Sequence, residues 1–154
     1  MNELCEINRN TLENNSHFSP YDYQQEIIKE AFNYFQSKQI GIIKIPCGTG
    51  KTLISLWIAM ALECKKILIS VPKLEIMDQW IEKAQLLYPD YKIYKNGNGN
   101  SIVDDIEDKT IIVTTYCSSH KLKQYNFNII IHDEMHHLTG LNETEKNFKQ
   151  ILNI

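Results

Sequence analysis

The chain has 154 residues, 43% of them hydrophobic, and a formal net charge of −3. This length supplies one hydrophobic core of ordinary size, so we expect a single domain. The mildly acidic balance excludes a histone-like positive coat, and any nucleic-acid binding must therefore come from local sites.

The four cysteines, Cys5, Cys47, Cys64 and Cys117, are scattered without the short spacing that is typical of zinc ligands. The longest nearly apolar run, residues 53–62, is too short to cross a bilayer. We recognise no charged and apolar leader near the amino terminus. These features predict a soluble, intracellular protein in a reducing compartment.

Polar residues rich in asparagine fill positions 1–20, and they predict a loosely ordered lead-in before a domain at 21–154. A helix is predicted to begin near Asp22 and to end in the polar stretch 36–38. Its apolar residues recur at helical spacing. They are Ile27, Ile28, Ala31, Phe32 and Phe35.

Short apolar runs follow, each too continuous for a half-exposed strand, and they predict buried parallel strands. The runs occupy residues 41–45, 66–71, 110–115 and 128–134. A further strand is predicted at 91–94.

Helical patterns alternate with these strands. We expect helices at 52–63, in a segment led by Pro72 with Trp80 on its apolar stripe, and at 143–151, with a short amphipathic piece at 116–124 before the last strand. Alternating strands and helices predict an α/β fold, a three-layer domain with a mainly parallel central sheet.

A glycine-rich stretch, PCGTGKT at residues 46–52, joins the first predicted strand to the next helix. Successive backbone N–H groups in such a loop can point at one anion, and the helix adds the positive end of its dipole. Lys51 would reach the β- and γ-phosphates of ATP, and Thr52 would ligate Mg²⁺. Ile45 stands where the strict GxxxxGKT pattern has its first glycine. The predicted phosphate-binding residues are Gly48, Thr49, Gly50, Lys51 and Thr52.

Two acids end the last predicted strand, NIIIHDE at residues 128–134. Open α/β sheets bind their ligands at the carboxyl ends of strands. We therefore expect Asp133 to hold Mg²⁺ and Glu134 to orient or deprotonate the attacking water. Together with Lys51, these are the predicted catalytic residues, and we expect the loop and the acids to meet around one metal-bound triphosphate.

The order of these segments resembles superfamily-2 helicases and translocases. Residues 133–136, DEMH, resemble their DExH box, and residues 46–52 resemble their motif I. Three more segments agree in order: Tyr23-Gln24 with the glutamine motif, Val71-Pro72-Lys73 and Gln79-Trp80 with motif Ia, and Thr114-Thr115-Tyr116 with the TTY segment before motif II. The resemblance runs from about residue 21 to 137 and is closest to the DEAD/DEAH branch that includes type I and type III restriction subunits.

The resemblance implies a RecA-like P-loop domain of a nucleic-acid-dependent ATPase. Gln24 would read the adenine edge, and His136 would link the ATP site to a second domain. Tyr21 stands where the family often has arginine before the glutamine motif. Contacts to the backbone of DNA or RNA would come from Pro72, Lys73, Thr114 and Thr115.

The family completes its ATP site with arginines from a second, C-terminal RecA-like domain, which we do not recognise in these 154 residues. Arg9 is the only arginine present. We expect the isolated chain to bind nucleotide weakly and hydrolyse ATP slowly, and to couple hydrolysis to movement only with that domain supplied in cis or in trans. The alternative is a nucleotide-binding module without turnover that acts by interaction.

Two rival interpretations fit the residues less well. His132, His136 and His137 invite a zinc site, but residues four apart in a strand lie about 13 Å apart, too far for one ion. A small-molecule kinase would need a lid with arginines.

Overall fold

The computed structural model describes residues 19–97 and 105–134. The predicted lead-in, apart from its last two residues, and the predicted helix at 143–151 lie outside them. Within the described ranges no helix is long and apolar enough to cross a membrane.

These residues fall into two compact units. The first holds the described residues up to Cys64 together with Leu86–Tyr88. The second holds Lys65–Gln85 and the described residues from Pro89 onward.

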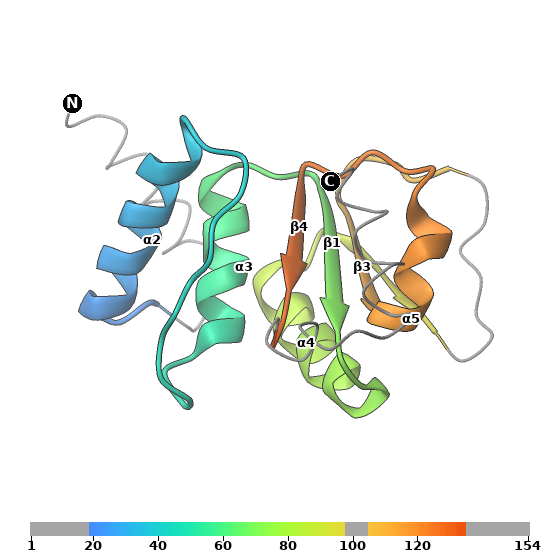
Figure 1. Ribbon diagram of the computed structural model, residues 1–154, viewed down its shortest axis with the longest axis horizontal. Coiled ribbons are helices and arrows are strands. Elements are labelled where there is room, and N and C mark those ends of the chain that lie inside the picture. Colours follow the sequence, from blue (N-terminus) through green and yellow to red (C-terminus); the bar gives the residue numbers. More distant parts are fainter. Residues whose placement is uncertain (1–18, 98–104, 135–154) are drawn as a thin grey trace, which may run out of the picture. The chain divides into compact units, whose positions relative to one another are not determined.

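The first unit is built on two helices, α2 (Asp22–Phe35) and α3 (Lys51–Ala61), which pack against each other (Figure 1). Helix α2 begins where Tyr21 N–H donates to the Gln24 carboxamide oxygen at 2.9 Å. Helix α3 is the more apolar of the two, and its buried residues are Ile54, Leu56, Trp57, Ile58, Ala59 and Ala61. Both helices confirm the periodicity in the sequence.

The strand predicted at 41–45 is wrong. Residues 41–46 form neither helix nor strand, and Ile42 and Ile43 are 75% and 39% exposed. A run of isoleucines favours burial, but a parallel strand forms only where a neighbouring strand accepts its backbone hydrogen bonds.

The second unit contains a parallel sheet of four strands in the order β2-β3-β1-β4. Strands β1, β3 and β4 can be followed side by side in Figure 1. The bounds are β1 Lys66–Val71, β2 Lys92–Asn96, β3 Thr110–Thr115 and β4 Ile129–His132. All four overlap segments where strands were predicted, and β2 runs two residues beyond the predicted 91–94.

Burial differs between the middle and the ends of this sheet. Strands β1 and β3 are almost entirely buried, as predicted. Strand β4 is half-buried throughout and β2 is largely exposed. The expectation that residues 128–134 are a fully buried strand is therefore wrong, because β4 pairs with β1 alone among the described strands.

Helices accompany the sheet within this unit. They are α4 (Leu74–Leu87), except for its last two residues, which belong to the first unit, together with α5 (Tyr116–Ser119) and the short 3₁₀ helix η1 (His120–Leu122). Leu68, Ile112 and Leu122 belong to one buried cluster, against which Ile130 packs. The observed α/β architecture with an all-parallel sheet agrees with the predicted fold class.

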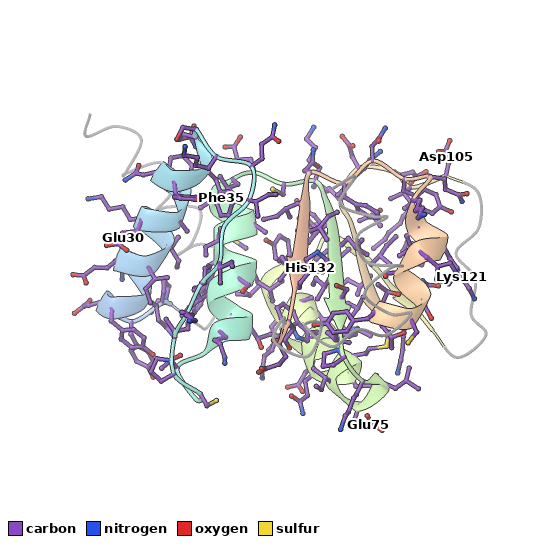
Figure 2. The ribbon with its side chains drawn as sticks, in the orientation of Figure 1. Glu30, Phe35, Glu75, Asp105, Lys121 and His132 are labelled. Carbon is purple, nitrogen blue, oxygen red and sulfur yellow. The ribbon has the colours of Figure 1, made fainter. Side chains whose placement is uncertain are left out.

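A row of polar residues crosses the sheet at the carboxyl ends of the strands, where each is the last or the last but one residue of its strand. The register places Asn96 opposite Thr114, Thr114 opposite Ser70, and Ser70 opposite His132. The Asn96 amide donates to the Thr114 hydroxyl at 3.1 Å, and Ser70 Oγ hydrogen-bonds His132 Nδ1. His132 is labelled on β4 in Figure 2. Side-chain hydrogen bonds of this kind between adjacent strands help to define a single alignment of the strands.

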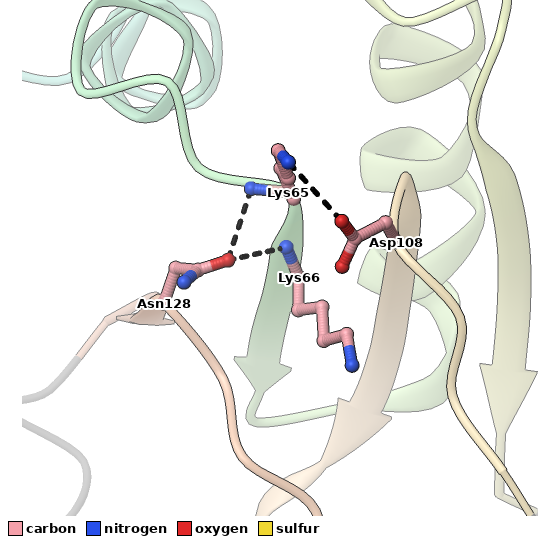
Figure 3. A network of polar contacts seen from close by, with 4 residues as sticks. All are labelled: Lys65, Lys66, Asp108 and Asn128. Atoms are coloured by element: carbon pink, nitrogen blue, oxygen red, sulfur yellow. Dashed lines mark hydrogen bonds and ion pairs between the residues drawn. The ribbon is translucent and has the colours of Figure 1, made fainter.

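A second polar network lies at the opposite end of the sheet, where the strands begin (Figure 3). The Asn128 side-chain oxygen accepts from the backbone N–H groups of Lys65, at 3.0 Å, and Lys66, at 2.8 Å. The Lys65 ammonium pairs with Asp108 at 3.2 Å. Because that ion pair is exposed, we assign the structural effect of the network to the Asn128 amide.

Candidate functional site

The glycine-rich loop of the first unit has the backbone conformation that its sequence requires. Gly48 and Gly50 have φ values of 80° and 84°, in the left-handed region that favours glycine. Between them, the Thr49 hydroxyl donates to the Pro46 carbonyl at 2.7 Å. Glycines in this conformation turn backbone N–H groups toward one side of a loop, which suits an anion.

The loop opens directly into α3. Gly50 is the residue before the helix, and Lys51 and Thr52 are its first two residues. The N–H groups of a first helical turn have no partners within the helix, and the helix dipole makes this end positive. The loop and helix therefore have a backbone geometry that suits an anion, with a lysine and a threonine on the first helical turn; phosphate binding by them stays a prediction.

Gln24 is buried, at 3% exposure, and not on a polar helix surface as its sequence context alone would indicate. Its amide nitrogen donates to the Thr49 carbonyl at 3.0 Å, and the Tyr23 hydroxyl donates to the same oxygen at 3.0 Å. A methyl group added at Gly50 would approach the Gln24 amide nitrogen to 2.8 Å. The start of α2 thus supports the loop directly, a role that the spacing of the residues did not indicate.

Asp133, in the second unit, follows β4 and is held at three points. Its N–H donates to the Ser70 carbonyl at 3.0 Å, which continues the pairing of β4 with β1. The Trp80 indole N–H donates to its carboxylate Oδ2 at 2.8 Å, and the Tyr116 hydroxyl donates to its backbone carbonyl. A carboxylate fixed in this way, partly exposed at a strand end, is the hard oxygen ligand that Mg²⁺ prefers.

Glu134 comes next and has an unusual backbone. Its φ of 54° lies in the left-handed region, which side chains other than glycine seldom adopt. Such conformations persist where the surrounding structure imposes them, and they cluster at functional sites. Its half-buried position at the strand end is compatible with the predicted role next to Asp133.

Two titrating groups near these acids stay neutral. Burial lowers the pKa of His132 from 6.5 to about 4. Burial, and secondarily the charges of Asp133 and Glu134, raises the pKa of Tyr116 far above its ordinary value. The Tyr116 hydroxyl therefore keeps the proton that it donates to Asp133.

The residues predicted to contact nucleic acid differ in their accessibility. Lys73 is exposed and Pro72 is half-buried, directly after β1. Thr115 is half-buried at the end of β3, where its hydroxyl donates to Ser118. Thr114 is fully buried in the polar row of the sheet, so its hydroxyl lies in the core and not on the surface.

The remaining predictions concern residues 136 and 137, which lie outside the described part of the chain. Within the described part, no three histidine, cysteine, aspartate or glutamate residues gather as a metal site. The loop belongs to the first unit and Asp133 to the second, so their meeting around one ligand stays a prediction.

Comparison with known proteins identifies the family. The family model described as "Type III restriction enzyme, res subunit" matches residues 17–154. The chain belongs to this family. It is a superfamily-2 ATPase domain of the helicase and translocase type, which confirms the resemblance seen in the sequence motifs.

A curated relative agrees with this assignment. The chain is 32% identical over 120 residues to the DNA 3'-5' translocase XPB2 of Sulfurisphaera tokodaii. The matched part covers 76% of this chain and 25% of the relative, so the chain spans about a quarter of that protein.

Solved structures share the fold. The SWI2/SNF2 ATPase core of Sulfolobus solfataricus, in complex with dsDNA, matches with a TM-score of 0.76 at 20% identity, over 88% of this chain and 30% of that one. The UvsW helicase of bacteriophage T4 matches with a TM-score of 0.65 at 26% identity, over 88% and 48% respectively. The RecA-like α/β fold of helicase cores is therefore established for this chain.

Proposed function

We propose that this chain binds Mg²⁺-ATP as the N-terminal RecA-like domain, residues 21–154, of a nucleic-acid-dependent helicase or translocase. The proposal rests above all on the loop at 46–50, whose two left-handed glycines lead straight into the Lys51-Thr52 turn of α3. In a member of an ATPase family, this geometry is best explained as a triphosphate cradle.

In the proposed complex, the N–H groups of Gly48, Thr49 and Gly50 bind phosphate oxygens and Lys51 neutralises the β- and γ-phosphates. Gln24 reads the adenine edge. One hydrogen of its amide is used on the Thr49 carbonyl and its oxygen accepts from Tyr21 N–H. We therefore assign its second amide hydrogen to the base.

Thr52 and Asp133 are proposed to hold the magnesium ion, and their hydroxyl and carboxylate oxygens suit it. When bound, the ion withdraws charge from the phosphate oxygens. Glu134 orients the attacking water and accepts its proton. Hydrolysis would be slow in the isolated chain, because Arg9 is its only arginine and a missing arginine finger costs about 10³- to 10⁵-fold in rate.

We place DNA ahead of RNA as the partner, because the curated relative is named a DNA translocase. Pro72, Lys73 and Thr115 would contact the phosphate backbone. Thr114 would support Thr115 from the core, and His136 would couple the ATP site to the second domain. Movement on nucleic acid would require that domain, in cis or in trans.

Nucleotide binding is tested first, by equilibrium titration of the purified chain with a fluorescent ATP analogue. Lys51→Ala should abolish binding, because the cradle loses its cation. Lys38→Ala removes an exposed lysine just beyond α2 and serves as the matched control. Equal binding by wild type and Lys51→Ala would refute the proposal.

Turnover separates the two candidate functions. ATP hydrolysis is measured with duplex DNA, single-stranded DNA or RNA, with and without a supplied second RecA-like domain. Stimulation by nucleic acid that depends on that domain supports the translocase proposal. Nucleotide binding with no turnover under any of these conditions would favour an interaction module.

A further inference from the structure

Two aromatic side chains converge on Asp133 from different parts of the second unit. Trp80 lies on α4 and Tyr116 directly follows β3. One donates to the Asp133 carboxylate and the other to its backbone carbonyl. Side chain and main chain of the same residue are thus fixed separately.

The Trp80 contact determines how the carboxylate is oriented. Trp80 is only 2% exposed, so packing fixes the direction of its N–H. The 2.8 Å bond to Oδ2 sets the plane of the carboxylate. Within the described part of the chain, Oδ1 has no hydrogen bond, and this is the oxygen that we expect to face a cation.

The Tyr116 contact fixes the position of the Asp133 backbone. Tyr116 is 4% exposed, and its hydroxyl reaches the Asp133 carbonyl from the end of β3, the strand on the other side of β1. Strand β4 is short, and Glu134 leaves it in a left-handed conformation. The backbone hydrogen bonds between β4 and β1 therefore hold Asp133 in place only weakly by themselves. The Tyr116 hydroxyl adds a hydrogen bond at the residue where the pairing of β4 with β1 ends.

We propose that Trp80 and Tyr116 are positioning residues for the magnesium ligand: they pre-organise Asp133 and thereby set the affinity of the nucleotide complex for Mg²⁺. This inference rests on the proposed function, in which Asp133 holds the ion. Residues that orient a metal ligand are typically worth 10- to 100-fold in metal affinity. Neither residue touches the nucleotide itself in this scheme.

Binding of a fluorescent ADP to the full chain is measured at increasing Mg²⁺ concentrations. The Mg²⁺ midpoint is the concentration at which half of the Mg²⁺-dependent gain in ADP affinity is reached. Trp80→Phe keeps most of the ring but removes the N–H donor. We expect it to raise the Mg²⁺ midpoint about tenfold while leaving ADP affinity without Mg²⁺ unchanged. Tyr116→Phe, which keeps its ring packing, should move the midpoint in the same direction.

Matched controls exist in the first unit. Trp57 is equally buried, and its indole nitrogen has no hydrogen-bond partner among the described residues, so Trp57→Phe removes the same atoms without breaking a bond. The Tyr88 hydroxyl donates to the Leu56 carbonyl at 2.7 Å, so Tyr88→Phe loses a buried tyrosine bond away from Asp133. Both controls should keep the wild-type Mg²⁺ midpoint.

The outcomes are distinct. A wild-type midpoint in both Trp80→Phe and Tyr116→Phe overturns the inference, as does an equal shift in the controls. If Trp80→Phe does not fold, Tyr116→Phe decides alone. If the wild-type protein binds no nucleotide, the proposed function is refuted. If binding depends on Mg²⁺ but is unchanged by both substitutions, only the positioning role is refuted.

Discussion

His132 should make the folded chain sensitive to mild acid. Its imidazole is half-buried on β4, in hydrogen-bond contact with Ser70, and burial lowers its pKa from 6.5 to about 4. As the pH falls through 6.5 the unfolded chain takes up a proton at this position, and the folded chain does not until about pH 4. Acid therefore favours the unfolded state across this window.

The size of the effect follows from the two pKa values. Proton linkage between 6.5 and about 4 removes about 2 kcal/mol of unfolding free energy between roughly pH 7 and pH 5. The loss reaches about 3 kcal/mol near pH 4. For a domain with an ordinary stability of roughly 5–15 kcal/mol, this is a large share.

The loss of unfolding free energy is measured by urea unfolding at a series of pH values. The variant His132→Gln keeps a polar side chain that does not titrate, and carboxylates elsewhere titrate in both proteins. The difference in unfolding free energy between wild type and variant should therefore shift by about 2 kcal/mol from pH 7 to pH 5. A constant difference across that range would refute the burial argument, and a shift of opposite sign would mean that the folded state favours the charged imidazole.

Substitutions in the loop and at the end of β3 should separate residues that look alike in sequence. Gly48→Ala and Gly50→Ala should each lose about 1–2 kcal/mol of stability from their left-handed φ. Gly50→Ala should lose more, because its methyl group would meet Gln24 and that at Gly48 would meet nothing; equal losses in urea unfolding would contradict this. Thr114→Val should cost about 1–3 kcal/mol by leaving a buried amide donor unsatisfied, with a smaller loss of DNA affinity than Thr115→Val. Thr115→Val should weaken DNA binding in a filter or fluorescence assay with little change in stability, and the reverse pattern would count against the assignment.

Local signals in the sequence predicted most of the fold. Continuous apolar runs marked β1 and β3 because both are buried on two faces, and helical spacing marked α2 and α3. The left-handed turn of the glycine-rich loop at 46–50 was predictable for a related reason. The motif of two glycines, a lysine and a threonine lies within one short segment, so its conformation could be predicted without knowing which distant residues it contacts.

Features that depend on distant partners were not predictable. The run at 41–45 is as apolar as β1, yet the structure gives it no strand. Trp80 was expected to be a core residue, which is confirmed, but its bond to Asp133 joins positions 53 residues apart. The burial of Gln24 and Thr114 likewise follows from hydrogen bonds to residues on other elements. Composition and periodicity describe one segment at a time and carry no signal for such pairs.

Asn128 bears on chemistry at the far end of its own strand. Strand β4 is only four residues long, so few backbone bonds fix how far it slides along β1. Asn128 fixes the start of β4. Its side-chain oxygen accepts hydrogen bonds from two backbone N–H groups, and its own N–H donates to the Lys66 carbonyl at 2.9 Å. A slip by one residue would exchange the sides of the sheet on which His132 and Asp133 project. The Asn128 amide therefore helps to hold β4 in the register that places Asp133, and not His132, on its side of the sheet.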